Sequence, residues 1–142
     1  MEKLNEESEL IEEEGLSLIC YKDSLGYWTI GVGHLLKSYC EPISLEYAGK
    51  LLKEDIAIAK EGLRKNIKFY GELDSVRQYV LLSMCFNLGI NKLLQFKKML
   101  LALENKNYVA AAAEMKDSKW YRQVKRRGEK LCYMMEFGCK KS

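Results

Sequence analysis

One stretch of the chain, residues 16–32, has the chemistry of strands and turns, whereas most of the remainder is helical in pattern. Leu18 and Cys20 suit a strand, and residues 23–26 suit a turn. Residues 27–30 are aromatic and β-branched, which favours a returning strand. One short hairpin among helices predicts an α+β chain with a small antiparallel β-lobe and a larger helical lobe.

Helical patterns flank the hairpin. Residues 6–14 read as a helix that ends before Gly15, and Ser44 suits the N-cap of a long helix that reaches Asn66. Further helical patterns cover residues 73–88, 92–103, 108–113 and 123–137. The long helix should bridge the two lobes.

Length favours a single domain over residues 1–142. Within it we expect a β-containing lobe at 12–55, with the start of the bridging helix, and a helical lobe at 56–142. The N-terminal helix, residues 1–11, should pack against the helical lobe. An apolar run long enough for a membrane helix is missing and the first residues are acidic, so neither membrane insertion nor a secretion signal is expected.

The chain contains five cysteines and a single histidine. No cysteines form a C-x-x-C pair, and His34 cannot complete a zinc set with them at a usual spacing. We therefore expect neither a metal nor any other cofactor. The thiols should be reduced, with Cys85 and Cys132 buried as small apolar side chains.

Two acids flank the first strand. Glu14 ends a helix, where carbonyl groups disfavour an ionised carboxyl, while Asp23 sits in a polar turn that favours the charged form. Such a contrast suits a glycosidase, and Thr29 could orient a water beside Asp23. Alternatively, Glu14 simply solvates a helix face and Asp23 simply forms a hairpin turn, as short motifs are weak signals.

The segment EGLSLICYKDSLGYWTIGVGHLL, residues 14–36, closely resembles the active-site segment of phage lysozymes related to that of the T-even phages. The family pattern is a glutamate, an aspartate, a threonine and then Gly-x-Gly-His. It is filled here by Glu14, Asp23, Thr29, Gly31, Gly33 and His34. Weaker resemblance continues at residues 74–89 and 118–130.

The resemblance implies hydrolysis of the β-1,4 bond between N-acetylmuramic acid and N-acetylglucosamine in bacterial peptidoglycan. Glu14 would protonate the leaving oxygen, and Asp23 with Thr29 would activate water, which would make the enzyme inverting. The residues alone do not decide the stereochemistry, because it depends on the separation of the carboxyl groups.

The resemblance also implies a set of substrate-binding residues: Gly33, Leu35, Phe86 and Glu114. Phe86 could equally be a core aromatic. Met99 and Glu114 stand where the T-even enzyme has uncharged polar residues, and Glu114 could repel carboxylates of the peptide or bind a cationic one. The loop between Leu36 and Ser44 is shorter than in those relatives.

Three further residues have supporting roles by resemblance. His34 would pair with Asp55 on the bridging helix and hold the lobes in register. Arg127 would face Glu14, where its positive charge would favour the ionised carboxyl group and oppose the effect of the helix end.

The resemblance implies a setting as well. A phage lysozyme would act in host lysis, remaining in the host bacterial cytoplasm until a holin-like membrane permeabiliser lets it reach the wall. We expect a monomer.

Two other functions are consistent with parts of the sequence. Residues 119–127 mix cations with aromatics, as nucleic-acid-binding segments do, but twenty acidic residues elsewhere offset them, and we expect no nucleic-acid partner. A catalytically inactive relative that binds the wall or serves in a baseplate is the other alternative. The presence of Glu14, Asp23 and Thr29 speaks against it.

Overall fold

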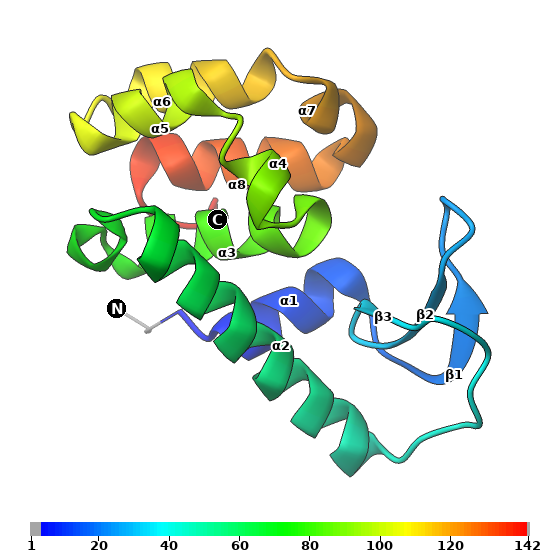
Figure 1. The fold of residues 1–142 in the computed structure, drawn as a ribbon. Helices are drawn as coiled ribbons and strands as arrows, with labels where there is room; N and C mark the ends of the chain where they lie inside the picture. Colours follow the sequence, from blue (N-terminus) through cyan, green and yellow to red (C-terminus); the bar gives the residue numbers. More distant parts are fainter. Residues whose placement is uncertain (1–3, 142) are drawn as a thin grey trace. The chain divides into compact units, whose positions relative to one another are not determined.

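The computed structural model describes residues 4–141 and divides into two compact units, unit 1 ending at Lys60 and unit 2 beginning at Glu61. Unit 1 holds a three-stranded antiparallel sheet, and the described part of unit 2 is helical (Figure 1). The predicted α+β class is therefore confirmed. Among the described residues, every helix is too short or too polar to cross a bilayer. Residues 1–3 of the predicted N-terminal segment, and Ser142, lie outside this description.

Helix α1 runs from Glu6 to Glu14, the range that the sequence predicts. The side-chain oxygen of Asn5 caps it by accepting a hydrogen bond from the backbone N–H of Ser8 at 3.0 Å. Gly15 ends it with a φ of 77°, which glycine adopts at little cost. Glu14 therefore stands in the last turn, where backbone carbonyls lack intrahelical donors.

The sheet follows directly, in the order β1 (Ser17–Lys22), β2 (Trp28–Gly31) and β3 (His34–Leu35). The register places Tyr21 of β1 opposite Thr29 of β2. An irregularity in the pairing precedes Tyr21, which locally bends the strand. The hairpin predicted from residues 16–32 is confirmed, and β3 pairs with the other edge of β2, so β2 is the central strand.

Helix α2 spans Leu45–Asn66. As predicted, Ser44 caps it, because its hydroxyl oxygen accepts a hydrogen bond from the Tyr47 N–H at 3.0 Å. Within unit 1, an ion pair between Lys60 and Glu6 connects α2 with α1. The boundary between the two units falls inside α2, directly after Lys60.

Unit 2 continues with short helices that enclose an apolar core. They are η1 (Tyr70–Glu72), α3 (Ser75–Leu88), α4 (Ile90–Leu93), α5 (Lys97–Glu104), α6 (Tyr108–Lys116), α7 (Lys119–Val124) and α8 (Arg126–Phe137). Helix α8 packs against both α3 and α6, and α5 packs against α6 (Figure 1). The helices predicted at 73–88 and 108–113 correspond closely to α3 and α6.

The prediction of one helix over residues 92–103 is wrong. The structure has α4 and α5 instead, with a break at residues 94–96. Phe96 leaves the helical region with a ψ of 57°, and its ring meets the Trp120 ring edge to face, with centroids 6.4 Å apart. Because apolar Leu94 and Phe96 are both half-buried at the break, the apolar pattern continues across it.

The helix predicted at residues 123–137 is also corrected. The chain breaks at Lys125, which has a φ of 50°, and α8 begins only at Arg126. Helix α7 folds back closely on α8: a Cβ atom placed on Gly128 would lie 2.8 Å from the ring of Tyr121. The two helices can cross this closely only because the chain changes direction at Lys125. The sequence gives no sign of this break, since position 125 is neither proline nor glycine.

Five free thiols are present, at Cys20, Cys40, Cys85, Cys132 and Cys139. Cys85 and Cys132 are buried, with exposed fractions of 8% and 1%. The prediction that these two serve as apolar core side chains is confirmed.

We expect Cys132 to resist alkylation while exposed Cys139 reacts. Burial raises the pKa of Cys132 to about 11 from 9.0, which leaves about 100-fold less thiolate at pH 8. Timed iodoacetamide labelling with peptide mass spectrometry measures the two alkylation rates, and equal labelling of both thiols would contradict the prediction.

The same pKa shift affects stability. Because the folded state holds the Cys132 proton more tightly than the unfolded state does, the Cys132 thiol stabilises the fold fully below pH 9. This contribution to the free energy of unfolding is lost as the pH rises to about 11.

Candidate active site

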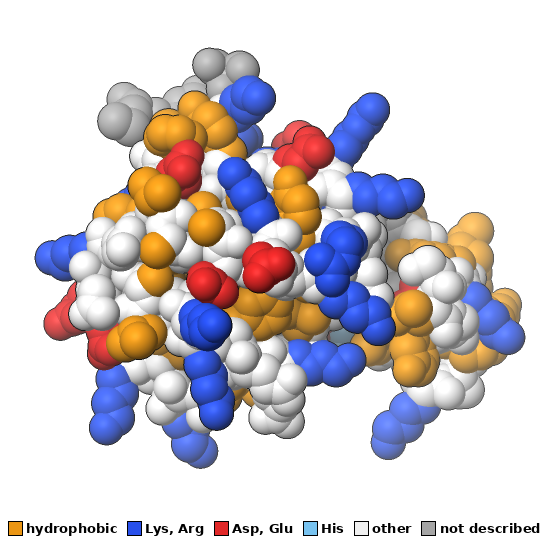
Figure 2. All heavy atoms as spheres, turned by 90° about the horizontal axis from the view of Figure 1, so that it is seen from above, with side chains coloured by type: hydrophobic (Ala, Val, Ile, Leu, Met, Phe, Trp, Pro, Cys, Tyr) orange, Lys and Arg blue, Asp and Glu red, His pale blue; other side chains and the backbone are white. Residues whose placement is uncertain are grey.

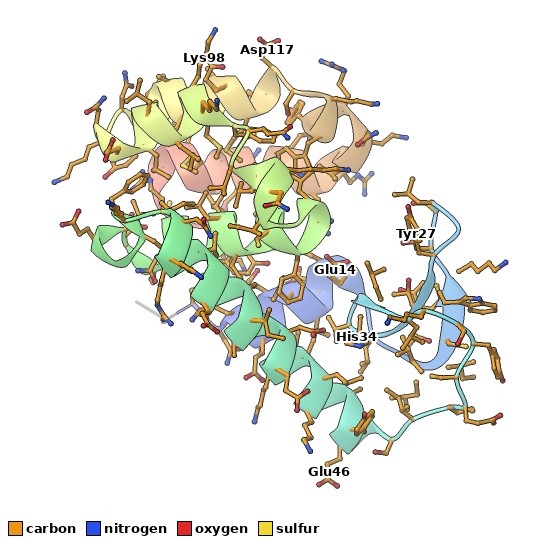
Figure 3. All side chains as sticks on the ribbon, viewed as in Figure 1. Glu14, Tyr27, His34, Glu46, Lys98 and Asp117 are labelled. Carbon is orange, nitrogen blue, oxygen red and sulfur yellow. The ribbon has the colours of Figure 1, made fainter. Side chains whose placement is uncertain are left out.

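Glu14 closes α1 with a partly exposed side chain, and the glycine before β3 leaves room for it. A Cβ atom placed on Gly33 would lie 3.0 Å from Glu14 Oε2 and 3.2 Å from Glu14 Cδ. Gly33 also has a φ of 66°, in the left-handed region that favours glycine. Figure 3 labels Glu14 at the end of α1 and His34, the neighbour of Gly33, close by. The sheet backbone therefore approaches this carboxyl group closely.

The turn between β1 and β2 holds Asp23 by its backbone. Asp23 Oδ1 accepts hydrogen bonds from the N–H groups of Leu25 and Tyr27, both at 2.9 Å. Gly26 allows this tight turn with a φ of 87°. The Asp23 side chain is partly exposed, and two amide donors stabilise its negative charge. A carboxylate so fixed can act as a base or as an electrostatic partner.

Thr29 is nearly buried, with an exposed fraction of 3%. Its hydroxyl donates to the carbonyl oxygen of Tyr27 at 3.0 Å. The same Tyr27 donates its N–H to Asp23, so one turn residue orients both side chains. The structure thus fixes the Thr29 hydroxyl and the Asp23 carboxylate on the same hairpin.

Tyr21 of β1 is a candidate site residue that the sequence does not single out. Burial, and then the negative charges of Glu14 and Asp23, raise the pKa of the Tyr21 phenol above its ordinary value of 10.0. The charges of both acids therefore affect this one phenol. Tyr21 also stands directly opposite Thr29 in the sheet. Strand spacing does not select it, because Asp23 lies in the turn beyond the end of β1 at Lys22.

His34 and Asp55 are in contact, with 2.7 Å between His34 Nδ1 and Asp55 Oδ2. His34 lies on β3 and Asp55 on the part of α2 that belongs to unit 1. The pair therefore joins the sheet to the long helix and fixes the backbone next to Gly33. Both side chains are partly exposed, at 28% and 24%.

Replacing Asp55 by asparagine should lower the free energy of unfolding by about 1–2 kcal/mol, because the amide cannot replace a charge-assisted hydrogen bond. Urea denaturation near neutral pH measures the loss. Glu54→Gln is the matched control, since Glu54 is exposed on the same helix and should change stability little. If both variants unfold at the same urea concentration, the pair has no role in holding β3.

Leu35 ends β3 with 62% of its side chain exposed, and the register places it opposite Thr29. An exposed leucine on the strand beside a buried threonine offers an apolar surface next to the hairpin. Its assignment to substrate binding stays a prediction.

Phe86 and Arg127 lie in unit 2. Phe86 is half-buried on α3, and Arg127 stands at the start of α8, where its Nη2 donates to Ser83 Oγ at 3.0 Å. This bond joins α8 to α3. The sequence-predicted roles of Phe86 toward substrate and of Arg127 toward Glu14 stay predictions.

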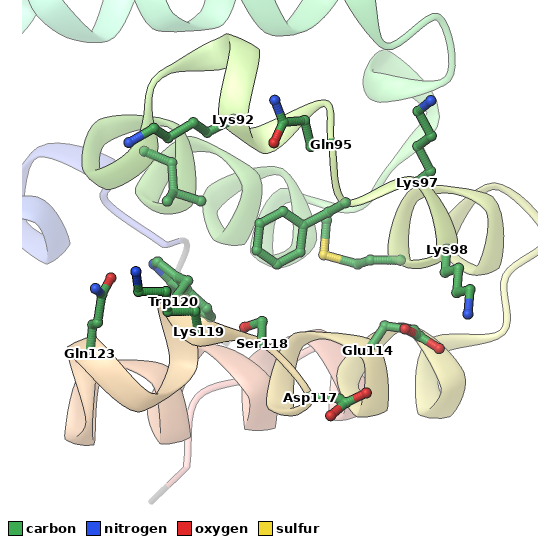
Figure 4. Close-up of a pocket in the computed structure, with 13 residues that line it drawn as sticks. Lys92, Gln95, Lys97, Lys98, Glu114, Asp117, Ser118, Lys119, Trp120 and Gln123 are labelled. Carbon is green, nitrogen blue, oxygen red and sulfur yellow. The ribbon is translucent and has the colours of Figure 1, made fainter.

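Glu114 lines a cavity of about 710 Å³ in unit 2 (Figure 4). The lining comes from the end of α3 at Leu88, from helices α4 to α7 and from the turns that join them, and Met99 and Trp120 form buried parts of it. Four cations surround the cavity together with the acids Glu114 and Asp117: Lys92, Lys97, Lys98 and Lys119. The indole N–H of Trp120 has no hydrogen-bond partner within residues 4–141.

The reactive groups that this candidate site offers are the carboxyl groups of Glu14 and Asp23. Within residues 4–141, no three His, Cys, Asp or Glu side chains gather as metal ligands would. A helix-end glutamate and a turn aspartate flank the first strand of a small sheet, and polysaccharide hydrolases use such pairs. Fold and site together define the class, a small lysozyme-like hydrolase. The family model for phage lysozyme matches residues 11–133, and the chain belongs to the phage lysozyme family.

Similar proteins support this class. The probable T4-type lysozyme 1 of Dictyostelium discoideum is 31% identical, over 89% of this chain and 90% of that protein. The endolysin of Salmonella phage P22 is 34% identical, over 72% and 73%. The peptidoglycan hydrolase gp36 of Pseudomonas phage phiKMV is 29% identical over 88% of this chain, which corresponds to 14% of that much longer protein.

Proposed function

We propose that the chain is a muramidase that hydrolyses the β-1,4 bond between N-acetylmuramic acid and N-acetylglucosamine in bacterial peptidoglycan. The observation that carries the proposal is the placement of two carboxyl groups at one small sheet: Glu14 lies against the backbone at Gly33, and two backbone N–H groups hold Asp23 in the β1–β2 turn. Both acids are partly exposed, as groups that must reach a polymer have to be. Two carboxyl groups gathered around one hairpin are the minimum that glycoside hydrolysis requires.

In the proposed reaction, Glu14 donates its proton to the glycosidic oxygen as the bond to the anomeric carbon breaks. Asp23 accepts a proton from a water that attacks this carbon from the opposite face, and the Thr29 hydroxyl orients the water. The water oxygen becomes the new anomeric hydroxyl with inverted configuration. Afterwards Glu14 is ionised and Asp23 is protonated, and exchange with solvent restores both.

Neighbouring residues position these groups. The two backbone amides on Asp23 Oδ1 fix the direction of its carboxylate, and a site held by backbone bonds needs little reorganisation during reaction. Gly33 gives the Glu14 carboxyl its space, and the contact of His34 with Asp55 holds the adjoining strand. We propose that Tyr21 helps to position the two carboxyl groups.

For substrate binding we propose Gly33, Leu35, Phe86 and Glu114. The cavity beside Glu114 is rimmed by four lysines, which favour carboxylate groups, while Glu114 itself favours an ammonium group. A peptide that carries both charges, as the stem peptides of the wall do, fits this mixed lining. Of the two roles open to Glu114, we therefore propose that it binds a cationic group.

We propose lysis of a host bacterium at the end of a phage cycle as the setting. The protein would act as a monomer without a cofactor, stay in the host cytoplasm and reach the wall once a holin-like protein has opened the membrane. The similarity to a phage endolysin supports this proposal.

The clearing of outer-membrane-permeabilised bacteria tests the proposal against the alternative of an inactive relative. The full chain should lower the turbidity of the suspension within minutes and should also release dye from labelled, purified peptidoglycan. Binding to peptidoglycan without dye release would show a wall-binding protein and overturn the muramidase proposal.

A nucleic-acid-binding role has little support in the structure. Trp120, within the basic segment at residues 119–127, is 4% exposed and therefore unavailable for base stacking. Figure 2 shows one face of the molecule on which carboxylate side chains lie among the Lys and Arg side chains. Mixed charges of this kind bind a phosphate backbone weakly.

A further inference from the structure

Two cysteines of unit 1 lie next to each other although twenty positions separate them in the chain. Cys20 belongs to β1 and is 7% exposed, and its thiol donates a hydrogen bond to the carbonyl oxygen of Cys40 at 3.3 Å. Cys40 is only half-buried and donates its own thiol to the Glu41 carbonyl oxygen, also at 3.3 Å. The two cysteines are therefore neighbours: Cys20 is buried in the sheet, and Cys40 is partly accessible to solvent.

The backbone keeps the two cysteines side by side. The N–H of Ile43 donates to the carbonyl oxygen of Leu18 at 2.8 Å, so the segment after Cys40 runs along the outer edge of β1. The thiols also affect each other directly, since burial and then the neighbouring Cys20 thiol raise the pKa of Cys40. Their contact is thus fixed by backbone as well as by side-chain interactions.

We propose that Cys20 and Cys40 form a redox-controlled disulfide that fastens the 36–44 loop to the edge of the sheet. A small-molecule disulfide, such as oxidised glutathione, supplies the oxidant. The Cys40 thiol loses its proton to solvent and its sulfur attacks the reagent, which expels one thiolate and leaves a mixed disulfide. Deprotonated Cys20 then attacks Cys40 Sγ and expels the second thiolate. Two protein thiols are oxidised and one reagent disulfide is reduced.

The bond would make the stability of unit 1 depend on the compartment. In a reducing cytoplasm the thiols stay free, and in an oxidising environment the bond closes a loop of about twenty residues and constrains the unfolded chain. The strand that it fastens continues directly into Tyr21 and Asp23, so the hairpin would gain rigidity. This inference does not depend on the proposed muramidase activity.

The test exposes the folded, full chain to oxidised glutathione at pH 8, followed by digestion without reduction and mass spectrometry. We expect a peptide pair joined between Cys20 and Cys40 with the loss of two hydrogens. The midpoint of thermal unfolding should rise by roughly 5 °C or more. Cys139→Ser should behave like the parent, because exposed Cys139 takes no part in the proposed bond.

Cys40→Ser and Cys20→Ser are the matched variants, and neither should gain thermal stability on oxidation. Cys40→Ser keeps the buried thiol and should fold, so that the test stays decisive if Cys20→Ser does not. Oxidation that yields only glutathione adducts or links between chains, with Cys20 and Cys40 never joined to each other, would overturn the proposal.

Discussion

Replacing Glu14 by glutamine is expected to lower the rate of peptidoglycan hydrolysis by about 1000-fold or more. Glutamine has nearly the same shape but carries no proton that it can donate to a leaving oxygen. The unfolding temperature should stay equal or rise, because a neutral amide removes the unfavourable contact of a charge with the carbonyl end of α1. Dye release from labelled peptidoglycan and thermal unfolding measure the two effects.

Glu12→Gln is the matched control for this substitution. Glu12 lies on the same helix, two positions away, and its side chain is exposed. This variant loses one negative charge as Glu14→Gln does, and it should keep the activity of the parent. A Glu14→Gln variant that releases dye at a comparable rate would show that another group is the proton donor.

Replacing Gly33 by alanine is expected to lower activity by about 10- to 100-fold, through displacement of the Glu14 carboxyl group. The added methyl group would lie 3.0 Å from Glu14 Oε2, so the carboxyl group must move away. The positive φ of Gly33 adds backbone strain of about 1–2 kcal/mol, which lowers stability as well. Initial rates of dye release and urea denaturation separate the two consequences.

Gly31→Ala separates strain from displacement. Gly31 has almost the same φ, 63° against 66° at Gly33, but a methyl group there would meet only Ala48 at an ordinary 3.8 Å. This variant should lose similar stability and keep most of its activity. Equal activity in the two alanine variants would mean that the approach of Gly33 to Glu14 does not matter for catalysis.

The β-lobe was predictable because local chemistry determines it. Gly15 ends α1, Asp23 forms its own turn and Ser44 caps α2, and each of these signals acts within four residues. The breaks at Phe96 and Lys125 were not predictable, since contacts with distant parts of unit 2 determine them. An aromatic that packs inward at a break keeps the apolar spacing of a continuous helix.

In the candidate site, too, residues determined by local sequence were predictable, and residues determined by distant contacts were not. Glu14, Asp23 and Thr29 could be selected from residue type, spacing and family resemblance. Tyr21 could not, because its nearness to both acids depends on how β1 pairs with β2 after an irregular register. The contact between Cys20 and Cys40 likewise requires the path of the 36–44 loop, which the sequence does not indicate.

Digestion of purified peptidoglycan in oxygen-18-labelled water, with mass spectrometry of the new chain ends, tests the central claim most directly. If Glu14 and Asp23 hydrolyse the muramyl bond, each cut should leave one labelled oxygen at the anomeric carbon of N-acetylmuramic acid. The Glu14→Gln variant should leave the polymer uncut. Unlabelled 1,6-anhydro ends, labelled N-acetylglucosamine ends or intact peptidoglycan would each contradict the claim.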